Sequence, residues 1–212
     1  MTCSRSPRGD RSPDSPTAWL VGCRRASCDI NAGMPTVFLV RHGEPGFPQI
    51  DAEGWRGPAR DWAPLTAKGI EQAKAAGRDL RQVGAHRIVA SPMTRALQTA
   101  SLIAAETHLP LTAVEIDLRE WLPDSTLPWR GLSDVQAFSS DFEQCEGEWP
   151  SGETRLWEPL SSVRGRALGA LRRQATGHSE PFIAVCHATV IRALTGHFHT
   201  EFCGIRVLED VS

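Results

Sequence analysis

Two histidines in the sequence each follow directly on a run of apolar residues. His42 comes after residues 37–40 and Arg41, and His187 comes after residues 182–186. A short apolar run of this kind predicts a buried strand. Because the carboxyl ends of parallel strands meet at one edge of an open α/β sheet, we expect both imidazoles at the same edge. Imidazole, with a reference pKa of about 6.5, is a good nucleophile at neutral pH.

Cationic side chains accompany these histidines, which points to phosphate as the group they handle. A phosphate group carries about two negative charges, and arginine forks and a protonated imidazole can offset them. Arg41, Arg95 and His187 supply those groups, so the sequence predicts that His42 is a nucleophile for phosphoryl groups. A carboxylic acid is then needed to protonate the leaving alkoxide, a transfer that accelerates reactions by about 10²–10⁴-fold.

The elements that must carry these residues alternate between strands and helices. Apolar runs predict strands at residues 37–40, 87–90, 110–116 and 181–186. Helical periodicity predicts helices that begin near residues 66, 91, 160 and 190. This alternation predicts a three-layer α/β/α sandwich with a mainly parallel central sheet, right-handed crossovers and ligands at the carboxyl ends of the strands.

Local signals add detail to three of these helices. Thr66 is the expected N-cap of the first, and Ser91, followed by Pro92, is the expected N-cap of the second. Apolar side chains recur on one face of the helix over residues 160–175. The arginines of that helix are therefore expected to point outward: Arg164, Arg166, Arg172 and Arg173.

Residues 121–159 have an irregular pattern, with four tryptophans and four prolines. Between Glu115 and Glu158 the chain has eleven acidic residues and three arginines, a local balance of −8. Loops this long in a compact domain are usually functional or disordered, and the tryptophans favour order. We interpret about residues 121–159 as an inserted lid whose negative charge disfavours polyanionic substrates.

Four short motifs stand in a characteristic order and spacing. They are Arg41-His42-Gly43-Glu44, the stretch from Ser91 to Ala100, Leu118-Arg119-Glu120, and the stretch from Cys186 to Arg192. Over about residues 36–195 this set resembles the histidine phosphatase superfamily, which has the phosphoglycerate-mutase-like fold. Pro150-Ser151-Gly152-Glu153-Thr154 also looks like the family's Gly-Glu-Ser element before its late helix.

The resemblance implies a reaction through phosphohistidine. His42 would become phosphorylated, while Arg41, Arg95 and His187 would hold the phosphoryl oxygens. An acid, Glu120, would protonate the leaving group and then act as the base that activates water. The resemblance implies no metal and no cofactor.

The assignment of the acid depends on the Leu-Arg-Glu frame around Glu120, which matches the family. Asp117 and Asp124 flank it and stay open as alternatives.

The sequence departs from the family pattern in two places. After His187 the chain has Ala188-Thr189 where the family often has two glycines, and the added side chains could narrow the pocket or let Thr189 bind the phosphate. The loop after Glu44 lacks the Trp-Asn pair typical of the mutases. We therefore expect a phosphomonoesterase for a small organic phosphate. The alternatives are a phosphotransferase or mutase, and a catalytically idle phosphate-binding module.

Composition limits the remaining classes. The 212 residues are 41% hydrophobic and 23% charged with a net charge of −2, which is typical of a globular domain without a nucleic-acid partner. No apolar run approaches the roughly 18 residues that cross a membrane, so no membrane partner is expected. Six cysteines without metal-ligand or disulfide spacing predict free thiols in a reducing, cytoplasmic compartment.

The two ends of the chain differ from its middle. Residues 1–33 are polar and aperiodic, and Met34 directly precedes the first predicted strand. We interpret residues 1–33 as an over-extended reading frame or a disordered arm, and residues 34–212 as the histidine phosphatase domain. The chain ends at Val211-Ser212, where we expect a final edge strand to start, so a truncated carboxyl-terminal edge is part of this interpretation.

Overall fold

The computed structural model describes residues 34–54, 57–127 and 132–209, and within them five strands form one sheet. The strand order is β3-β2-β4-β1-β5, in which neighbours from β3 to β1 are parallel and β5 is antiparallel to β1. The strands are β1 (Val37–Arg41), β2 (Ile88–Ala90), β3 (Leu111–Val114), β4 (Phe182–Cys186) and β5 (Ile205–Leu208). The predicted α/β fold with a mainly parallel sheet is confirmed. The expectation that an edge strand would begin only at Val211 was wrong, because β5 already forms that edge.

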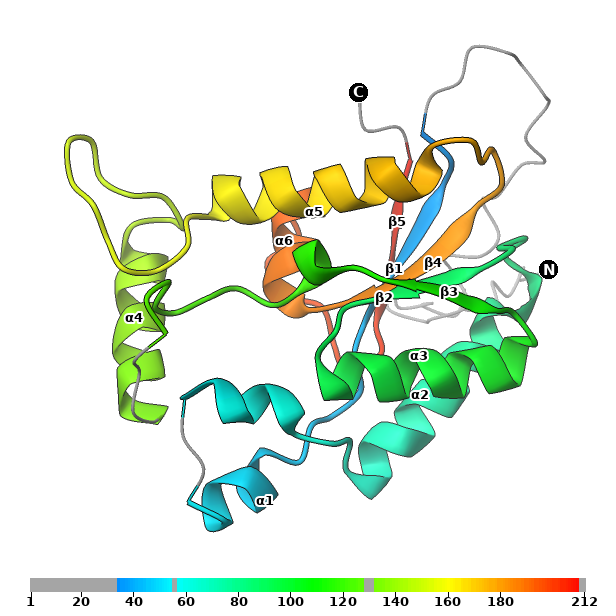
Figure 1. Cartoon of the computed structure of the whole chain (residues 1–212), viewed down its shortest axis with the longest axis horizontal. Helices are drawn as coiled ribbons and strands as arrows, with labels where there is room; N and C mark the ends of the chain where they lie inside the picture. Colours follow the sequence, from blue (N-terminus) through cyan, green and yellow to red (C-terminus); the bar gives the residue numbers. More distant parts are fainter. Residues whose placement is uncertain (1–33, 55–56, 128–131, 210–212) are drawn as a thin grey trace, which may run out of the picture.

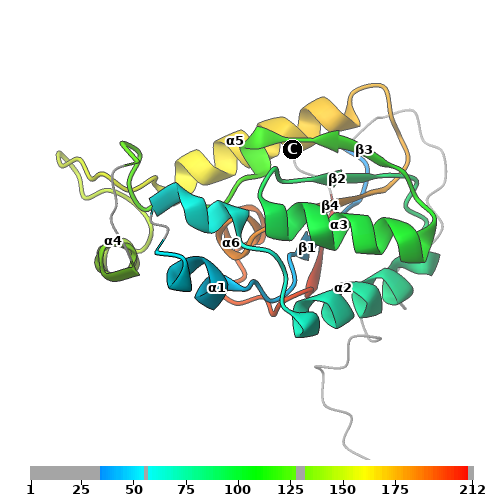
Figure 2. The ribbon, with the colours of Figure 1, turned by 60° about the horizontal axis from the view of Figure 1, so that its bottom comes forward.

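Helices cover both faces of this sheet (Figures 1 and 2). One face carries α5 and α6, and the other carries α3, with α2 packed against α3. The helices are α1 (Phe47–Ala52), α2 (Ala67–Asp79), α3 (Thr94–Thr107), α4 (Leu132–Gln144), α5 (Leu160–Ala175) and α6 (Ala188–Thr195). Three short 3₁₀ turns join them: η2 (Gly57–Trp62), η3 (Leu80–Gln82) and η4 (Ile116–Leu118).

The core divides along the alternation of each strand. In β1, Val37 and Leu39 pack toward α5 and α6, whereas Phe38 and Val40 pack toward α3. Every residue of β4 is buried, as expected for the central strand of a sheet covered on both faces. No helix of the described ranges is long and apolar enough to cross a membrane.

The expected helix caps have different outcomes. Thr66 caps α2, since its hydroxyl accepts a hydrogen bond from the Gly69 N–H at 3.0 Å. The prediction for Ser91 was wrong: α3 begins at Thr94, its N-cap residue is Met93, and no side chain caps it. The hydroxyl of Ser91 is instead engaged with a histidine ring.

Residues 121–159 contain the 13-residue helix α4, so the irregular pattern predicted for them was only partly correct. Figure 1 shows α4 beside the start of α5, away from the sheet. Phe142 of α4 packs against Trp121 and Trp157, with ring centroids 5.0 and 5.2 Å apart. Trp129 and residues 1–33 lie outside the described residues. The interpretation of residues 121–159 as a lid stays a prediction.

One close backbone contact yields a stability prediction. A Cβ atom on Gly43 would lie 2.6 Å from the carbonyl oxygen of Gly69, in the first turn of α2. We expect Gly43→Ala to lower the free energy of unfolding by about 1–3 kcal/mol, because neither backbone can move easily. Urea denaturation measures this. Gly165→Ala in α5 is the matched control: its Cβ would meet open space, and it should raise stability by about 0.5–1 kcal/mol. Equal stability of Gly43→Ala and wild type would contradict the prediction.

Candidate active site

The pairing of β1 with β4 brings the two predicted histidines together. Arg41 is in register with Cys186, and the backbone N–H of His42 donates to the Cys186 carbonyl at 3.0 Å. The imidazoles of His42 and His187 lie with ring centroids 5.0 Å apart, and both residues are buried. The sheet therefore places both rings at one edge, as the strand pattern predicted.

The hydrogen bonds of His42 determine which of its ring nitrogens carries the proton. Its Nδ1 lies 2.7 Å from the carbonyl oxygen of Gly43, which can only accept, so Nδ1 carries the proton. Its Nε2 then holds the lone pair and accepts from Nε of Arg95 at 3.2 Å. Burial, together with the charges of Arg95 and Arg41, lowers the pKa of His42 to about 3. The imidazole is therefore neutral and nucleophilic at physiological pH.

The two arginines approach His42 from different elements. Arg95, the second residue of α3, is buried, and its guanidinium also contacts the Arg60 carbonyl at 3.4 Å and the Asp61 carboxylate at 3.7 Å. Arg41 donates from Nη1 to the Thr200 carbonyl at 2.7 Å and stacks over Phe202 at 4.0 Å. Its buried Nε has no hydrogen-bond partner among the described residues, which leaves a donor for a ligand oxygen.

His187 is held by the serine that was predicted to be a helix cap. Nε2 of His187 lies 2.7 Å from Oγ of Ser91, and both residues are fully buried. Oγ of Ser91 already accepts from the Met93 N–H at 3.4 Å, which favours donation of its own proton to Nε2. Nδ1 then carries a proton, and it has no hydrogen-bond partner among the described residues. Ser91 thus leaves Nδ1–H free to donate to a ligand.

The protonation state of His187 differs from the sequence expectation. Burial, with smaller effects from Arg95 and His42, lowers its pKa well below the ordinary value. His187 is therefore neutral rather than the protonated imidazole that was expected. A dianionic phosphate beside it would raise this pKa again.

Glu120 lies just beyond η4 and its carboxyl group points into the same charged cluster. Oε1 accepts the backbone N–H of Trp121 at 2.9 Å, and the hydroxyl of Thr189 hydrogen-bonds the carboxyl group. Burial raises the pKa of Glu120, an effect that the charges of Arg95 and Arg41 oppose in part. A carboxyl group with a raised pKa can keep a proton for a leaving group. Thr189, predicted to bind phosphate, here contacts this carboxyl group.

The other acids considered from the sequence are engaged elsewhere. Asp117 accepts from Arg173 at 2.7 Å, and Asp124 accepts the Thr126 N–H at 2.8 Å within its own turn. Both carboxylates are thus committed to structural hydrogen bonds.

The stretch that resembles the Gly-Glu-Ser element precedes α5, and residues 155–159 lie between the two. Glu153 is exposed and pairs with Arg155 at 2.6 Å. The buried acid that precedes α5 is Glu158, two residues before the helix starts.

Sequence reasoning missed Asp61, Ser91 as a histidine partner, and the loop of Thr200 and Phe202. Only Ser91 had a usable signal, since it directly follows β2, the strand next to β4.

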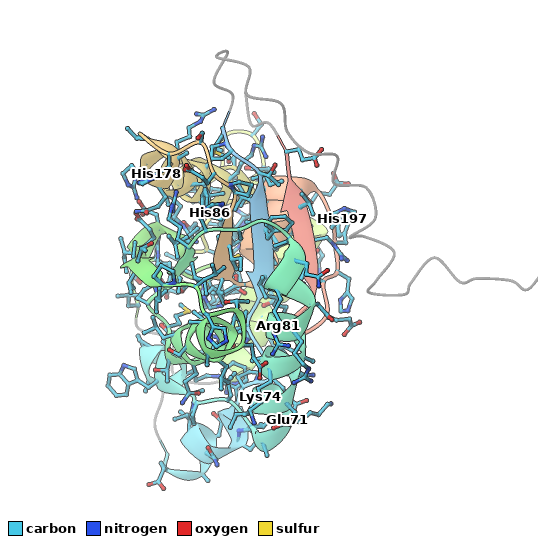
Figure 3. All side chains as sticks on the ribbon, turned by 90° about the vertical axis from the view of Figure 1, so that its right-hand side faces the viewer. Glu71, Lys74, Arg81, His86, His178 and His197 are labelled. Atoms are coloured by element: carbon cyan, nitrogen blue, oxygen red, sulfur yellow. The ribbon has the colours of Figure 1, made fainter. Side chains whose placement is uncertain are left out.

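His86 and His178 are exposed in connectors before β2 and β4, and His197 is exposed after α6 (Figure 3). A surface pocket of about 420 Å³ is lined by Glu143, Arg192 and Phe198 among others, and it does not include His42, His187 or Glu120.

Fold and site together define a class of protein: an α/β sandwich that holds two neutral imidazoles among arginines at the carboxyl edge of its sheet. The family model of the histidine phosphatase superfamily (branch 1) matches residues 37–203, and the chain belongs to this superfamily.

Individual relatives agree with this membership. The uncharacterized phosphatase PhoE of Bacillus subtilis is 28% identical over 163 residues, 76% of each chain. The probable phosphoglycerate mutase GpmB of Salmonella paratyphi C is 42% identical over 79 residues, only 37% of this chain and 35% of that protein. Among solved structures, a mycobacterial glucosyl-3-phosphoglycerate phosphatase in complex with VO3 has a TM-score of 0.64 at 18% identity, with 82% and 91% of the two chains covered. This last likeness concerns the fold.

The two neutral histidines make stability depend on pH. The pKa of His42 is about 3 when folded, below its ordinary value, so between about pH 6.5 and 3 only the unfolded chain takes up this proton. The pKa of His187 is also lowered in the folded protein, so this residue makes stability depend on pH in the same direction. Stability should therefore fall on acidification through this window, by up to about 1.4 kcal/mol per pH unit for each histidine. We expect His42→Asn to show a shallower decrease in urea unfolding between pH 7 and 4.5. Parallel curves for the variant and the wild type would contradict the assignment of a neutral His42.

Proposed function

We propose that this protein is a phosphomonoesterase that hydrolyses a small organic phosphate through a phosphohistidine on His42. The observation that carries the proposal is the ring of His42: Nδ1 is held by the Gly43 carbonyl, and Nε2 faces the guanidinium of Arg95. Such a nitrogen needs no base to become a nucleophile. The membership of the superfamily and the relative PhoE support the same reaction class.

In the first step, Nε2 of His42 attacks the phosphorus atom and the bond to the ester oxygen breaks. Arg41 and Arg95 offset the charge on the transferring oxygens, and Nδ1–H of His187 donates a further hydrogen bond. The protonated carboxyl group of Glu120 gives its proton to the departing alkoxide, which leaves as the alcohol. The bond to Nε2 converts His42 into phosphohistidine.

In the second step, the carboxylate of Glu120 takes a proton from water, and the oxygen attacks the phosphorus atom. The P–N bond breaks, which returns His42 to its neutral state and releases inorganic phosphate. Thr189 supports both steps, because its hydroxyl hydrogen-bonds the carboxyl group of Glu120.

The charges around the site favour a leaving group without further negative charge. Asp61 lies 3.7 Å from the guanidinium of Arg95, on η2. A second anionic group on the substrate would be repelled by this carboxylate. We therefore expect an uncharged alcohol or sugar-like leaving group.

A panel of phosphate monoesters with the wild type and His42→Ala tests the reaction. We expect the wild type to release phosphate from at least one monoester that has an uncharged leaving group, with or without EDTA. Because His42 is the nucleophile, His42→Ala should lower kcat/KM by at least about 10³-fold. Rapid quench with ³²P-labelled substrate should trap an acid-labile phosphoenzyme only in proteins that keep His42. His86→Ala, at an exposed histidine outside the site, is the matched control and should keep wild-type activity. Absence of hydrolysis across the panel in wild type would overturn the proposal and favour an idle phosphate-binding module.

Transfer to an alcohol is the second candidate, and the partial match to GpmB favours it. It would use the same phosphohistidine, with an alcohol replacing water in the second step. Incubation of labelled ester with increasing concentrations of glycerol distinguishes transfer from hydrolysis. We expect free phosphate to stay the main product, because uncharged water needs no acceptor site. Labelled glycerol phosphate as the main product would assign the protein to the transferases.

A further inference from the structure

One arginine of α5 reaches the backbone that carries Glu120. Nη1 of Arg166 donates to the carbonyl oxygens of Asp117 and Arg119 at 2.6 and 2.8 Å, and Nη2 contacts the carbonyl of Glu120 at 3.3 Å. The side chain of Arg166 is only 10% exposed, so the expectation that it points into solvent was wrong. It replaces the hydrogen bonds that this short segment would otherwise make with water.

Glu158 holds the same guanidinium in place. Its carboxylate accepts Nε and Nη2 of Arg166 at 2.6 and 2.9 Å, a bidentate pair in a buried location. It also accepts Nη2 of Arg119 at 3.3 Å and the Leu122 N–H at 3.4 Å. The carboxylate thus ties α5 to residues on both sides of Glu120.

The backbone of Glu158 completes the connection. Its N–H donates to the Leu122 carbonyl at 3.0 Å, and its carbonyl accepts the indole Nε1–H of Trp121 at 2.7 Å. Residues 117–122 are therefore fixed from one side by the side chains of Arg166 and Glu158, and from another by the backbone of Glu158. The carboxyl group of Glu120 extends from this fixed segment toward Arg95 and Arg41.

We propose that Arg166 and Glu158 form a clamp that positions Glu120 for proton transfer to the leaving group. This inference rests on the proposed function, in which Glu120 is the acid. Neither clamp residue touches the reacting atoms; both act through the segment 117–122. A displacement of about 1 Å in a catalytic group can cost about 10²-fold in rate, so such a clamp has a direct effect on activity.

The geometry of the arginine fork is essential to this role. Arg166 uses Nε, Nη1 and Nη2 at once, which a lysine with one ammonium group cannot do. Arg166→Lys keeps the positive charge near His187 but loses the fork, so it separates positioning from electrostatics. Glu158→Gln is the second variant, because it keeps the shape of the partner and removes its charge.

The test compares esters that differ in their need for an acid. A 4-nitrophenyl group leaves without protonation, whereas an alkyl alcohol requires it. We expect Arg166→Lys and Glu158→Gln to lower kcat/KM for an alkyl phosphate by about 10–100-fold, and for 4-nitrophenyl phosphate by less than about 3-fold. The basic limb of the pH profile for the alkyl ester should also move. Arg164→Lys is the matched control: Arg164 lies on the same helix but bonds the carbonyls of Ala193 and Leu194, and both esters should respond to it alike.

The Glu120→Gln variant separates failure of the clamp from failure of the acid assignment. If Glu120→Gln loses activity selectively on the alkyl ester and the clamp variants do not, the clamp is overturned and Glu120 stays the acid. If Glu120→Gln lowers kcat/KM equally for both esters, both the assignment of Glu120 as the acid and the clamp are contradicted. Adding Arg166→Lys to Glu120→Gln should cause little further loss on the alkyl ester, because Arg166 acts through Glu120. Additive losses would contradict the proposal. If Arg166→Lys does not fold, Glu158→Gln alone gives the same comparison.

Discussion

The pairing of β4 with β1 is the constraint on which the site depends. These strands are separated by about 140 residues of chain, yet their register sets Arg41 beside Cys186 and so His42 beside His187. A shift of one residue would turn every side chain of β1 to the opposite face of the sheet and bury the wrong set. The apolar alternation that divides β1 between α3 and the α5–α6 layer therefore also fixes where the two imidazoles lie. Core packing and active-site geometry have the same physical cause.

Burial at this sheet edge decides the protonation state of each group. The imidazoles lose water and stand near arginines, so their neutral forms are favoured and His42 keeps a lone pair. The same loss of water raises the pKa of Glu120, so its neutral form is favoured as well. Arg41 and Arg95 keep their charges and stand ready for an anion. One environment therefore favours a neutral imidazole, a neutral carboxyl group and a pair of charged guanidinium groups, which are the groups that the proposed reaction requires.

Much of this arrangement could be predicted from local sequence, because strands and caps have short-range signals. The runs ending at Arg41 and Cys186 gave the strand ends, and Thr66 gave a cap. Arg166 shows the limit. Helical periodicity separates apolar from polar faces, so it assigned this arginine to solvent along with Arg164. Its buried place depends on Glu158 and on the carbonyls of residues 117–120, which are 46 to 49 positions distant.

The proposed nucleophile and the proposed acid are thus held by different means. His42 is fixed by the ladder between two central strands, whose hydrogen bonds are shared by the whole sheet. Glu120 is fixed by a few side chains of α5 and its preceding loop, so a substitution at one of these positions would shift the carboxyl group without altering the sheet. The indole of Trp121 bonds the Glu158 backbone, so Trp121 and the segment that carries Glu120 share one attachment point. Phe142 of α4 packs on Trp121, so a displacement of α4 would reach the segment that carries Glu120 before it reached the strands that hold His42.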